Sequence, residues 1–314
     1  MNQSTEEEAV GSDESEANEA VLQAIFGSAP ERREEIEQLW RDYSPRFLQA
    51  ADRPGFMLEG GPFEMVLFNS RTMLQIWILG FAAERAFVDY GGIVFIAGLS
   101  ERFPAEDVLG VSPDHFNALI RAVTELGEVE RIRDFKWPAA APHPSRGKPS
   151  NLYGAMTFDL LVMAAAYVFL HEVEHVRLRS SSGKELSPKE EELVCDTFAR
   201  ETLLGRIQDY SMESGYALDI LTTKRAMSIA LASFLLFVIT PSKLWGGSDA
   251  HPPVLERIKA LTNSLALPPS DHFWIYLSSL LIAYLRSCGI DLPAMKSFAA
   301  KDICLELLAR VPGG

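Results

Sequence analysis

The sequence is poor in cysteine. Cys195, Cys288 and Cys304 are an odd number of thiols, widely spaced along 314 residues and set in apolar, helix-like surroundings. This pattern argues against a disulfide framework and against a CxxC metal site. We therefore expect a protein of a reducing compartment, the cytoplasm.

Basic residues are also scarce, since 29 lysines and arginines face 43 acidic residues and give a formal net charge of -14. A charge of this sign repels phosphate backbones and anionic membrane surfaces. Nucleic acid is therefore excluded as an expected partner.

Long hydrophobic runs are missing too. The two longest, Ala226 to Thr240 and Phe273 to Leu285, are shorter than the roughly 20 residues that span a bilayer. The acidic N-terminus has no basic start and no apolar stretch, so we expect residues 1–20 to be a disordered, solvated tail and no secretory signal. We predict buried core helices, and membrane association is disfavoured.

Hydrophobic residues are plentiful, at 47% of the chain, so a large core can form. The hydrophobic spacing predicts a mainly α (α+β) protein with a small β element. Residues 21–150 form its N-terminal helical and α+β part, 151–265 its catalytic core, and 266–314 a helical extension. The expected elements before residue 151 are helices over 31–50, 71–88 (capped by Ser70) and 113–126, strands over 63–68 and 92–96, and a proline-rich loop over 137–150. The glycine-bounded strand 92–96 is a candidate for pairing with an extended substrate.

The segment His171-Glu172-Val173-Glu174-His175 carries the chemistry. It ends a long helix, predicted from Met156 to Leu178, whose first part is apolar on every side. His171 and His175 lie one turn apart, so both imidazoles point the same way and can share one ion, while Glu172 sits beside that ion. This is the geometry in which zinc (Zn²⁺) makes a water acidic and a carboxylate takes its proton. The alternative is a helix with two incidental histidines, but burying unsatisfied imidazoles would be costly.

A third ligand is expected from the next helix, which Ser187-Pro188 starts with a capping box completed by Glu190. Its acidic residues Glu190, Glu191, Glu192 and Asp196 fall on or beside an apolar face, where acids are unusual unless a cation waits there. The helix N-terminus explains Glu190 and Glu191 but not Asp196. At 100° per residue, Glu191 and Glu192 both project towards that face. Glu192 is the stronger candidate because Asp196, one turn later, can accept the free ring N–H of a metal-bound histidine.

Asp249-Ala250-His251-Pro252-Pro253 precedes a further helix. His251 is either a loop residue at a helix entry or, if it reaches the cleft, a group that stabilises an oxyanion.

The order of HEVEH, E-L-V-C-D and D-A-H-P-P-V-L-E-R-I resembles the gluzincin metallopeptidases over Ala155 to Leu261. It looks most like the Lit-type phage exclusion peptidases, with a weaker likeness to HtpX-like and CAAX prenyl endopeptidases. The resemblance implies a zincin-like helical core and a cytoplasmic protease that acts in abortive phage defence by cleaving a host translation factor. By position it implies the metal ligands His171, His175 and Glu192, the general base Glu172, the outer acid Asp196 and the helper His251.

Two other functions remain open. A membrane-associated protease of the HtpX or CAAX type would dip its apolar helices into lipid, which their length and the acidic charge disfavour. A non-enzymatic regulatory protein with a structural zinc would have a closed four-ligand site, with His251 or Asp196 as the fourth ligand. The substrate bond, the activating trigger and the oligomeric state stay open.

Overall fold

The computed structural model describes residues 3–311 except 62, 101, 104, 181–185, 291 and 293–298, with side chains from residue 16 onward. Its helices are α1 (Gln3–Ser28), α2 (Arg33–Tyr43), α3 (Ser70–Ser100), α4 (Ala105–Gly110), α5 (Asp114–Glu128), α6 (Leu152–Ser180), α7 (Pro188–Leu204), α8 (Ile207–Ser214), α9 (Leu218–Ile239), α10 (Val254–Ser264), α11 (His272–Ser287) and α12 (Ala300–Leu308). Its strands are β1 (Arg46–Gln49), β2 (Leu58–Gly60) and β3 (Met65–Phe68). The predicted mainly α fold with a small β element is confirmed.

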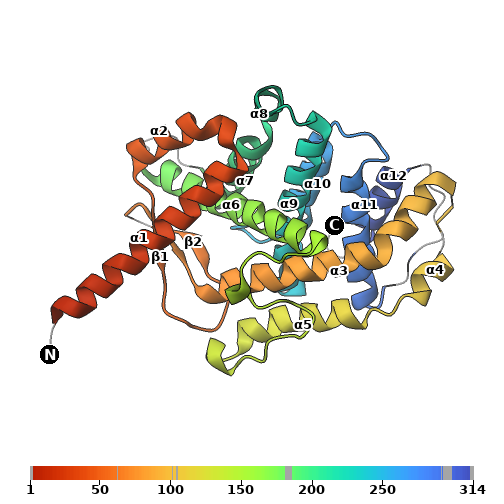
Figure 1. Ribbon diagram of the computed structural model, residues 1–314, viewed down its shortest axis with the longest axis horizontal. Coiled ribbons are helices and arrows are strands. Elements are labelled where there is room, and N and C mark those ends of the chain that lie inside the picture. The colour runs from red at the N-terminus through yellow and green to blue at the C-terminus, as the bar shows by residue number, and fades with distance from the viewer. Residues whose placement is uncertain are drawn as a thin grey trace.

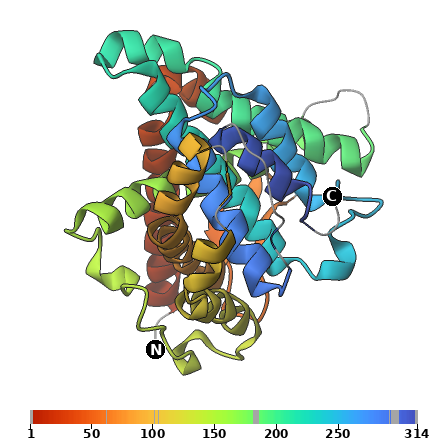
Figure 2. The ribbon, with the colours of Figure 1, turned by 90° about the vertical axis from the view of Figure 1, so that its right-hand side faces the viewer.

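Helix α6 is central to the packing and contacts α1, α3, α7 and α9 (Figure 1). The predicted helix over Met156 to Leu178 is confirmed, and most of its apolar residues from Leu160 to Val176 are buried because neighbours cover several of its sides. One hydrophobic core extends from Val21 on α1 to Val311 after α12, with α11 against α3, α9 and α12. The turned view in Figure 2 shows α11 and α12 within the stack of helices. The segments expected as core and extension thus share one interior.

The three strands form a small sheet in the order β1-β3-β2, with β1 parallel and β2 antiparallel to β3. The predicted strand over 63–68 corresponds to β3. Strand β2 is at an edge of this sheet and contacts α6. The edge of β2 thereby reaches the half of α6 that carries the histidines.

The helix predicted over 31–50 is only partly right. Helix α2 ends at Tyr43 because Ser44 adopts the left-handed conformation and Pro45 cannot continue the helix. The chain then enters β1, which the sequence did not predict. Phe47 of β1 is fully buried, so its apolar side chain serves the sheet and not an amphipathic helix.

The strand predicted over 92–96 is wrong, because these residues lie within α3. The paired glycines Gly91 and Gly92 do not end the helix either. Helix α3 packs on α11 and α12 and buries Val94 and Ala97, so tertiary contacts outweigh the β propensity of this segment. Since it is not a strand, it offers no backbone edge to a substrate.

The tail expected over residues 1–20 is also different, since α1 is helical from Gln3. Asn18 makes two hydrogen bonds to the backbone of Phe47, accepting from its N–H at 3.0 Å and donating to its carbonyl at 3.2 Å. Val21 and Ile25 join the core one and two turns later. Asn18 thus attaches the end of a segment that its composition alone predicts to be a solvated tail.

Two further predictions about local structure agree with the structure, and the cysteines can be described. Residues 137–150 form a loop without strand or α-helix, α7 has the predicted capping box, and the described cysteines are free. Within the described part of the chain two helices, α6 and α9, are long and apolar enough to cross a membrane by length and composition. In each, more than half of the most apolar window is buried by the rest of the protein, as in the core helices that the sequence predicts.

Candidate metal centre

The two histidines of the HEVEH segment converge inside the protein. His171 and His175 are each only 6% exposed, and their Nε2 atoms lie 3.2 Å apart on one face of α6. The ring planes are inclined by 72°, so the rings meet at their edges. Two nitrogen lone pairs directed at one point would repel each other unless a proton or a cation lies between them.

Helix α7 brings a carboxylate to this point. Its capping box fixes the start of the helix: the Glu190 N–H donates to Ser187 Oγ, and the Ser187 N–H donates to the Glu190 carboxylate. From that start, Glu192 faces the histidines, with Oε1 3.4 Å from His175 Nε2 and Oε2 3.5 Å from His171 Nε2. The structure therefore brings together the three residues predicted as ligands.

The Nδ1 atoms of His171 and His175 each lie close to a different carboxylate. His171 Nδ1 lies 2.9 Å from Asp196 Oδ1, in a short contact whose angle is poor for a hydrogen bond. His175 Nδ1 lies 2.6 Å from Glu191 Oε1. Such carboxylates hold the Nδ1 proton and leave Nε2 free as a ligand. Asp196 is where the sequence predicted it, whereas the contact of Glu191 was not foreseen.

Arg257 of α10 fastens two of these acids. Its Nη2 lies 2.8 Å from Glu192 Oε2, and its Nε lies 2.8 Å from Asp196 Oδ2. Its side chain is only 15% exposed. Burial lowers the pKa of this guanidinium, but the charges of Asp196, Tyr167 and Glu192 raise it above its ordinary value.

The charges of the cluster favour a cation. Burial alone would lower the pKa of His171, but Asp196 and Glu192 raise it to about 9. Burial works against ionised Glu192, yet contacts with His171 and His175 hold its pKa well below its ordinary value. The carboxylates of Glu191, Glu192 and Asp196 thus surround the two imidazoles, and their negative charge favours a bound cation.

The donor atoms fit a divalent metal ion. At metal–nitrogen distances of about 2.0 to 2.1 Å, neighbouring donors of a tetrahedral site are roughly 3.3 Å apart. The spacings between the two Nε2 atoms and the Glu192 oxygens, 3.2, 3.4 and 3.5 Å, match this edge. Cys195 is a further candidate, since its buried thiol lies within 4.8 Å of a nitrogen of each histidine. Burial raises the pKa of this thiol, which works against the thiolate that a metal requires.

Glu172 lies at the junction of α6 and β2. Its Oε2 accepts a 2.6 Å hydrogen bond from the N–H of Gly60, and Arg179 of α6 donates to the Gly60 carbonyl. A Cβ at position 60 would lie 2.8 Å from the Glu172 carbonyl oxygen and 2.9 Å from His175 Cβ, so only glycine permits this approach. Burial raises the pKa of the Glu172 carboxyl, whereas the two histidines and the Gly60 N–H lower it, and the net direction is upward.

His251 stands at the mouth of the site. Its side chain is 66% exposed, and its Nδ1 lies 3.5 Å from Glu192 Oε1. His251 and Glu192 line one cavity of about 500 Å³. Its full lining is Leu58, Glu59, Gly60, Gly61, His171, Glu172, His175, Arg179, Glu192, His251 and Arg257. The structure thus brings all the predicted residues to one place, with Asp196 behind the cavity wall. The proline-rich loop 137–150 is not part of this lining, and Trp77 of α3 donates to the carbonyl of Pro142 within it.

The family of the chain follows from comparison with known families. A family profile described as Peptidase U49 matches residues 66–277, about two thirds of the chain, including all of α6, α7 and α10. The chain belongs to the Peptidase U49 family. Curated proteins and solved structures gave no match.

Several residues around the centre of this U49 peptidase were missed by sequence reasoning. Arg257 had a detectable signal, because two acids on an apolar face of α7 require a buried cation in addition to any metal. The roles of Gly60 and Glu191 had none, since each depends on a contact between segments far apart in the sequence. Cys195, next to Asp196, was read only as an apolar core residue.

Proposed function

We propose that this U49 peptidase is a zinc-dependent endopeptidase. The observation that carries the proposal is the trio of His171 Nε2, His175 Nε2 and the Glu192 carboxylate at tetrahedral spacing, beside a buried glutamate at the edge of a cavity. Two imidazoles and one carboxylate are a ligand set of catalytic zinc sites, which keep one position open. In such a site the metal supplies Lewis acidity towards water and carbonyl oxygen.

Glu172 acts as the general base. One of its oxygens is held by the Gly60 N–H, which fixes the carboxylate beside the cavity and leaves the other oxygen to exchange protons. It takes a proton from the attacking water and delivers it to the amine that leaves when the peptide bond breaks. Its upward-shifted pKa brings its basicity closer to neutral pH, where proton transfer in both directions is efficient.

His251 stabilises the oxygen of the scissile carbonyl as that oxygen gains negative charge. Its exposed imidazole at the cavity mouth can donate a hydrogen bond to the substrate without displacing a ligand. Arg257 serves as a positioning residue, because it holds Glu192 and Asp196 in place from α10. Neither role requires the two residues to touch the metal.

An extended substrate lies along the edge of β2. Leu58, Glu59 and Gly60 line the cavity, and β2 has no strand partner on the side away from β3 among the described residues. Strand addition to such an edge gives a peptide a fixed direction past the catalytic group. The N–H and carbonyl of Gly60 already bond to Glu172 and Arg179, so pairing begins on the Leu58 side.

A narrower proposal follows the resemblance to Lit-type peptidases. In that case the enzyme works in the cytoplasm, in abortive defence against phage, and its substrate is a host translation factor. The support is the order of motifs over Ala155 to Leu261 together with an acidic chain of net charge -14 that has no expected affinity for nucleic acid.

The experiment compares new protein N-termini in cells that express the wild type or Glu172→Gln, together with the zinc content of both purified proteins. We expect stoichiometric zinc in both and new N-termini only with the wild type. Identical N-terminal profiles despite bound zinc would refute a peptidase and favour a structural zinc. Fractionation without detergent tests the membrane-associated alternative, which predicts sedimentation with the membranes.

The structural-zinc alternative requires a fourth ligand. Asp196 is poorly placed for it, because it faces Nδ1 of His171 while the convergent atom is Nε2. His251 is mostly exposed. The observation that favours this alternative is the buried thiol of Cys195 near both rings.

A further inference from the structure

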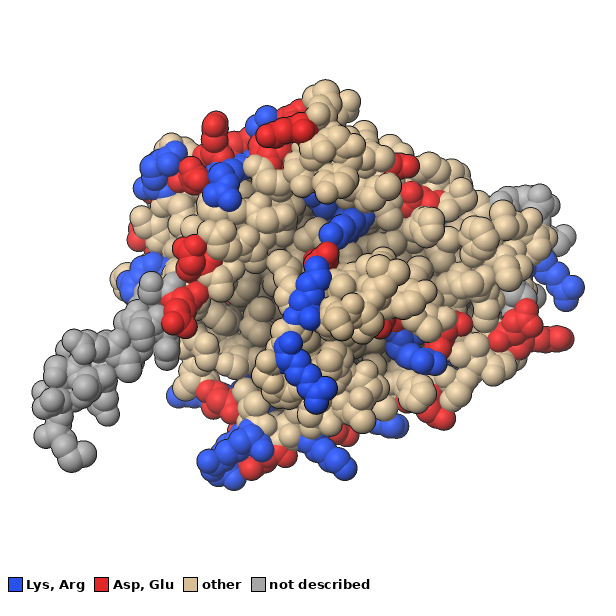
Figure 3. All heavy atoms as spheres, viewed as in Figure 1, with Lys and Arg blue, Asp and Glu red and all other residues tan. Residues whose placement is uncertain are grey.

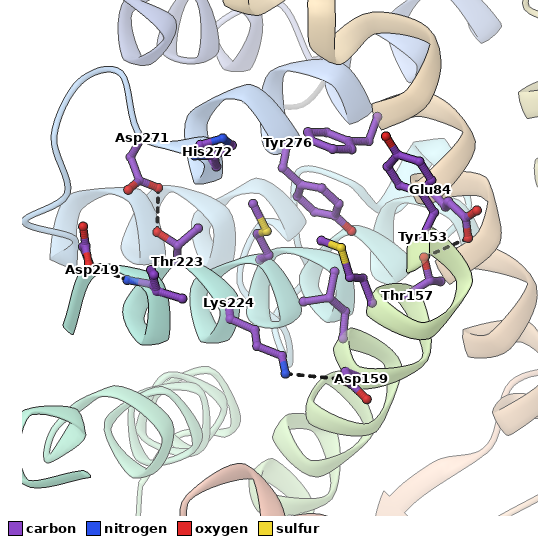
Figure 4. A pocket seen from close by; sticks show the side chains of 15 residues that line it. Glu84, Tyr153, Thr157, Asp159, Asp219, Thr223, Lys224, Asp271, His272 and Tyr276 are labelled. Carbon is purple, nitrogen blue, oxygen red and sulfur yellow. Dashed lines mark hydrogen bonds and ion pairs between the residues drawn. The ribbon is translucent and has the colours of Figure 1, made fainter. Parts of the chain in front are cut away.

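A second cavity, away from the metal centre, lies between the first turns of α6, α9 and α11 and the middle of α3. Its volume is about 530 Å³, within the range of small-ligand pockets. Its lining residues are Glu84, Phe87, Tyr153, Met156, Thr157, Asp159, Leu160, Asp219, Ile220, Thr223, Lys224, Met227, Asp271, His272 and Tyr276 (Figure 4). Met156 precedes His171 by 15 residues on α6, so the two sites are roughly 22 Å apart along one helix.

The middle of this pocket is apolar and adaptable. Met156 and Met227 contribute flexible thioethers, and Phe87 and Tyr276 pack their rings with centroids 6.0 Å apart. At the rim Ile220 is 64% exposed and Tyr153 is 52% exposed. A soluble protein that leaves such side chains around a hollow offers a place for an apolar group of another molecule.

A polar atom at the end of a largely buried side chain points into the apolar middle. Tyr276 is 95% buried, and among the described residues its hydroxyl has no hydrogen-bond partner. Figure 4 shows this hydroxyl directed into the pocket. This hydroxyl is open to the pocket, so it can bond to a polar group of an occupant.

The two ends of the pocket are acidic. Figure 4 shows Asp219 and Asp271 at one end and Glu84 at the other. Asp271 accepts from Thr223 Oγ1 at 2.7 Å and Glu84 accepts from Thr157 Oγ1 at 2.9 Å. In the described part of the chain no lysine or arginine pairs with these three carboxylates, whereas Asp159 pairs with both Lys148 and Lys224. Figure 3 shows wide uncharged areas on this face, divided by a line of basic side chains that crosses its middle.

We propose that this pocket binds a peptide segment of a partner protein in which an apolar side chain stands next to a lysine or arginine. The apolar side chain enters between Met156 and Met227, the peptide backbone bonds to the Tyr276 hydroxyl, and the basic residue meets Asp219 and Asp271. A lipid tail offers the hydroxyl no partner, and an anionic lipid surface would face three carboxylates that no lysine or arginine of the described chain neutralises. A peptide satisfies the apolar, polar and charged parts together.

The experiment selects random dodecapeptides on the immobilised full chain carrying Glu172→Gln, so that bound peptides stay intact. Selected peptides are then measured by fluorescence polarisation against three further substitutions in that background. Ile220→Arg puts a cation at the rim. Leu109→Arg is the matched control, because Leu109 is 67% exposed on α4 and lies outside the pocket. Tyr276→Phe removes only the hydroxyl.

We expect peptides rich in Lys or Arg beside aliphatic or aromatic residues. Their affinity should fall about tenfold or more in Ile220→Arg because like charges meet, and about two- to tenfold in Tyr276→Phe for the loss of one hydrogen bond. Leu109→Arg and removal of metal with EDTA should leave binding unchanged. Selection of no such peptides, or equal binding by Ile220→Arg and Leu109→Arg, would overturn the proposal.

Two further arms identify a wrong occupant. If EDTA abolishes binding, the peptides occupy the metal centre and not this pocket. If the wild type sediments with phosphatidylcholine vesicles and Ile220→Arg does not, the pocket contacts lipid. Neither arm depends on catalysis, so a failed peptidase assay leaves this test intact.

Discussion

The backbone N–H of Gly60 and the carboxylate of Glu172 are joined by a 2.6 Å hydrogen bond between β2 and α6. The two residues are 112 positions apart, and the bond places the edge of the sheet beside the glutamate that we propose as the general base. The approach depends on the missing Cβ at position 60, since that atom would stand 2.8 Å from the Glu172 carbonyl oxygen. The helix backbone cannot yield there without disturbing His171 and His175.

Gly60→Ala should therefore impair both stability and catalysis. Forcing a methyl group against the backbone of α6 costs about 1 to 3 kcal/mol, and it displaces Glu172 from its donor. Gly92→Ala is the control, because it lies in α3 with nothing within 4 Å of its Cβ position. There alanine should stabilise the helix by up to about 1 kcal/mol. Urea unfolding and peptidase assays of both variants check this, and equal behaviour of the two would contradict the close approach.

Glu172→Gln should abolish hydrolysis while the protein keeps its metal. The glutamine preserves the hydrogen bond from Gly60 but cannot accept a proton. His171→Ala should lose the metal and part of the stability, since ligands from α6 and α7 contribute binding energy to folding. Metal analysis together with activity separates the two roles. Zinc loss in Glu172→Gln, or full zinc in His171→Ala, would refute the assignment.

Local patterns in the sequence predicted the centre of the site well. The spacing of His171 and His175 and the capping box at Ser187 both report backbone geometry within a few residues, and each is present as expected. The positions of Glu172 and Glu192 beside the histidines follow from the same helical periodicity. The acids of α7 indicate that a buried cation is present, but its identity as Arg257 and the contact of Glu191 depend on how α7, α10 and α6 pack together, which no local pattern contains.

The errors in the fold have the same origin. Residues 92–96 have strong β propensity, yet they continue α3 because that helix packs on α11 and α12. Strand β1 was not predicted because the spacing of Phe47 matches the apolar face of the preceding helix. In the structure that helix ends before Ser44 and Pro45, and Phe47 belongs to a strand. In both cases long-range burial decided between two locally acceptable structures.

The role of Asn18 in attaching α1 to the sheet can be tested. The polar, acidic composition predicts that deleting Met1 to Asn18 leaves peptidase activity and thermal stability nearly unchanged, but Asn18 makes two hydrogen bonds with Phe47. Asn18→Ala should destabilise the protein by about 1 to 3 kcal/mol, because it leaves part-buried backbone groups of β1 unsatisfied. Glu16→Ala, an exposed neighbour, is the control and should be neutral. If both variants unfold at the same urea concentration as the wild type, Asn18 does not anchor the helix.

Protonation of His171 predicts opposite pH dependences for two quantities: the stability of the metal-free protein and the affinity for zinc. The folded-state pKa of His171 is raised to about 9 because, despite burial, Asp196 and Glu192 favour its protonated form. In the metal-free protein this stabilises the fold fully below the unfolded value of about 6.5, and the contribution is lost as pH rises through 9. Zinc must displace the same proton, so its affinity should rise over that window. Urea unfolding in EDTA and zinc titrations at pH 6.5 to 9.5 measure the two slopes. Slopes of the same sign would show that His171 does not hold this proton.

The order of zinc affinities among α7 variants tests the ligand assignment most directly. Glu192→Ala should lose most of its affinity, because its carboxylate is the group that lies within 3.5 Å of both Nε2 atoms. Asp196→Ala should lose about 10- to 100-fold, since it only holds the Nδ1 side of His171.

Glu191 and Cys195 complete the comparison. The sequence alone predicts almost no effect for Glu191→Ala, but its 2.6 Å contact with His175 Nδ1 makes it equivalent to Asp196, so we expect a loss of about 10- to 100-fold here too. Cys195→Ser should change the affinity little, because burial keeps that thiol protonated. Zinc titration with a competing chelator ranks the four variants. A severe loss in Cys195→Ser with a mild one in Glu192→Ala would assign the third ligand to the thiol and leave the two histidines in place.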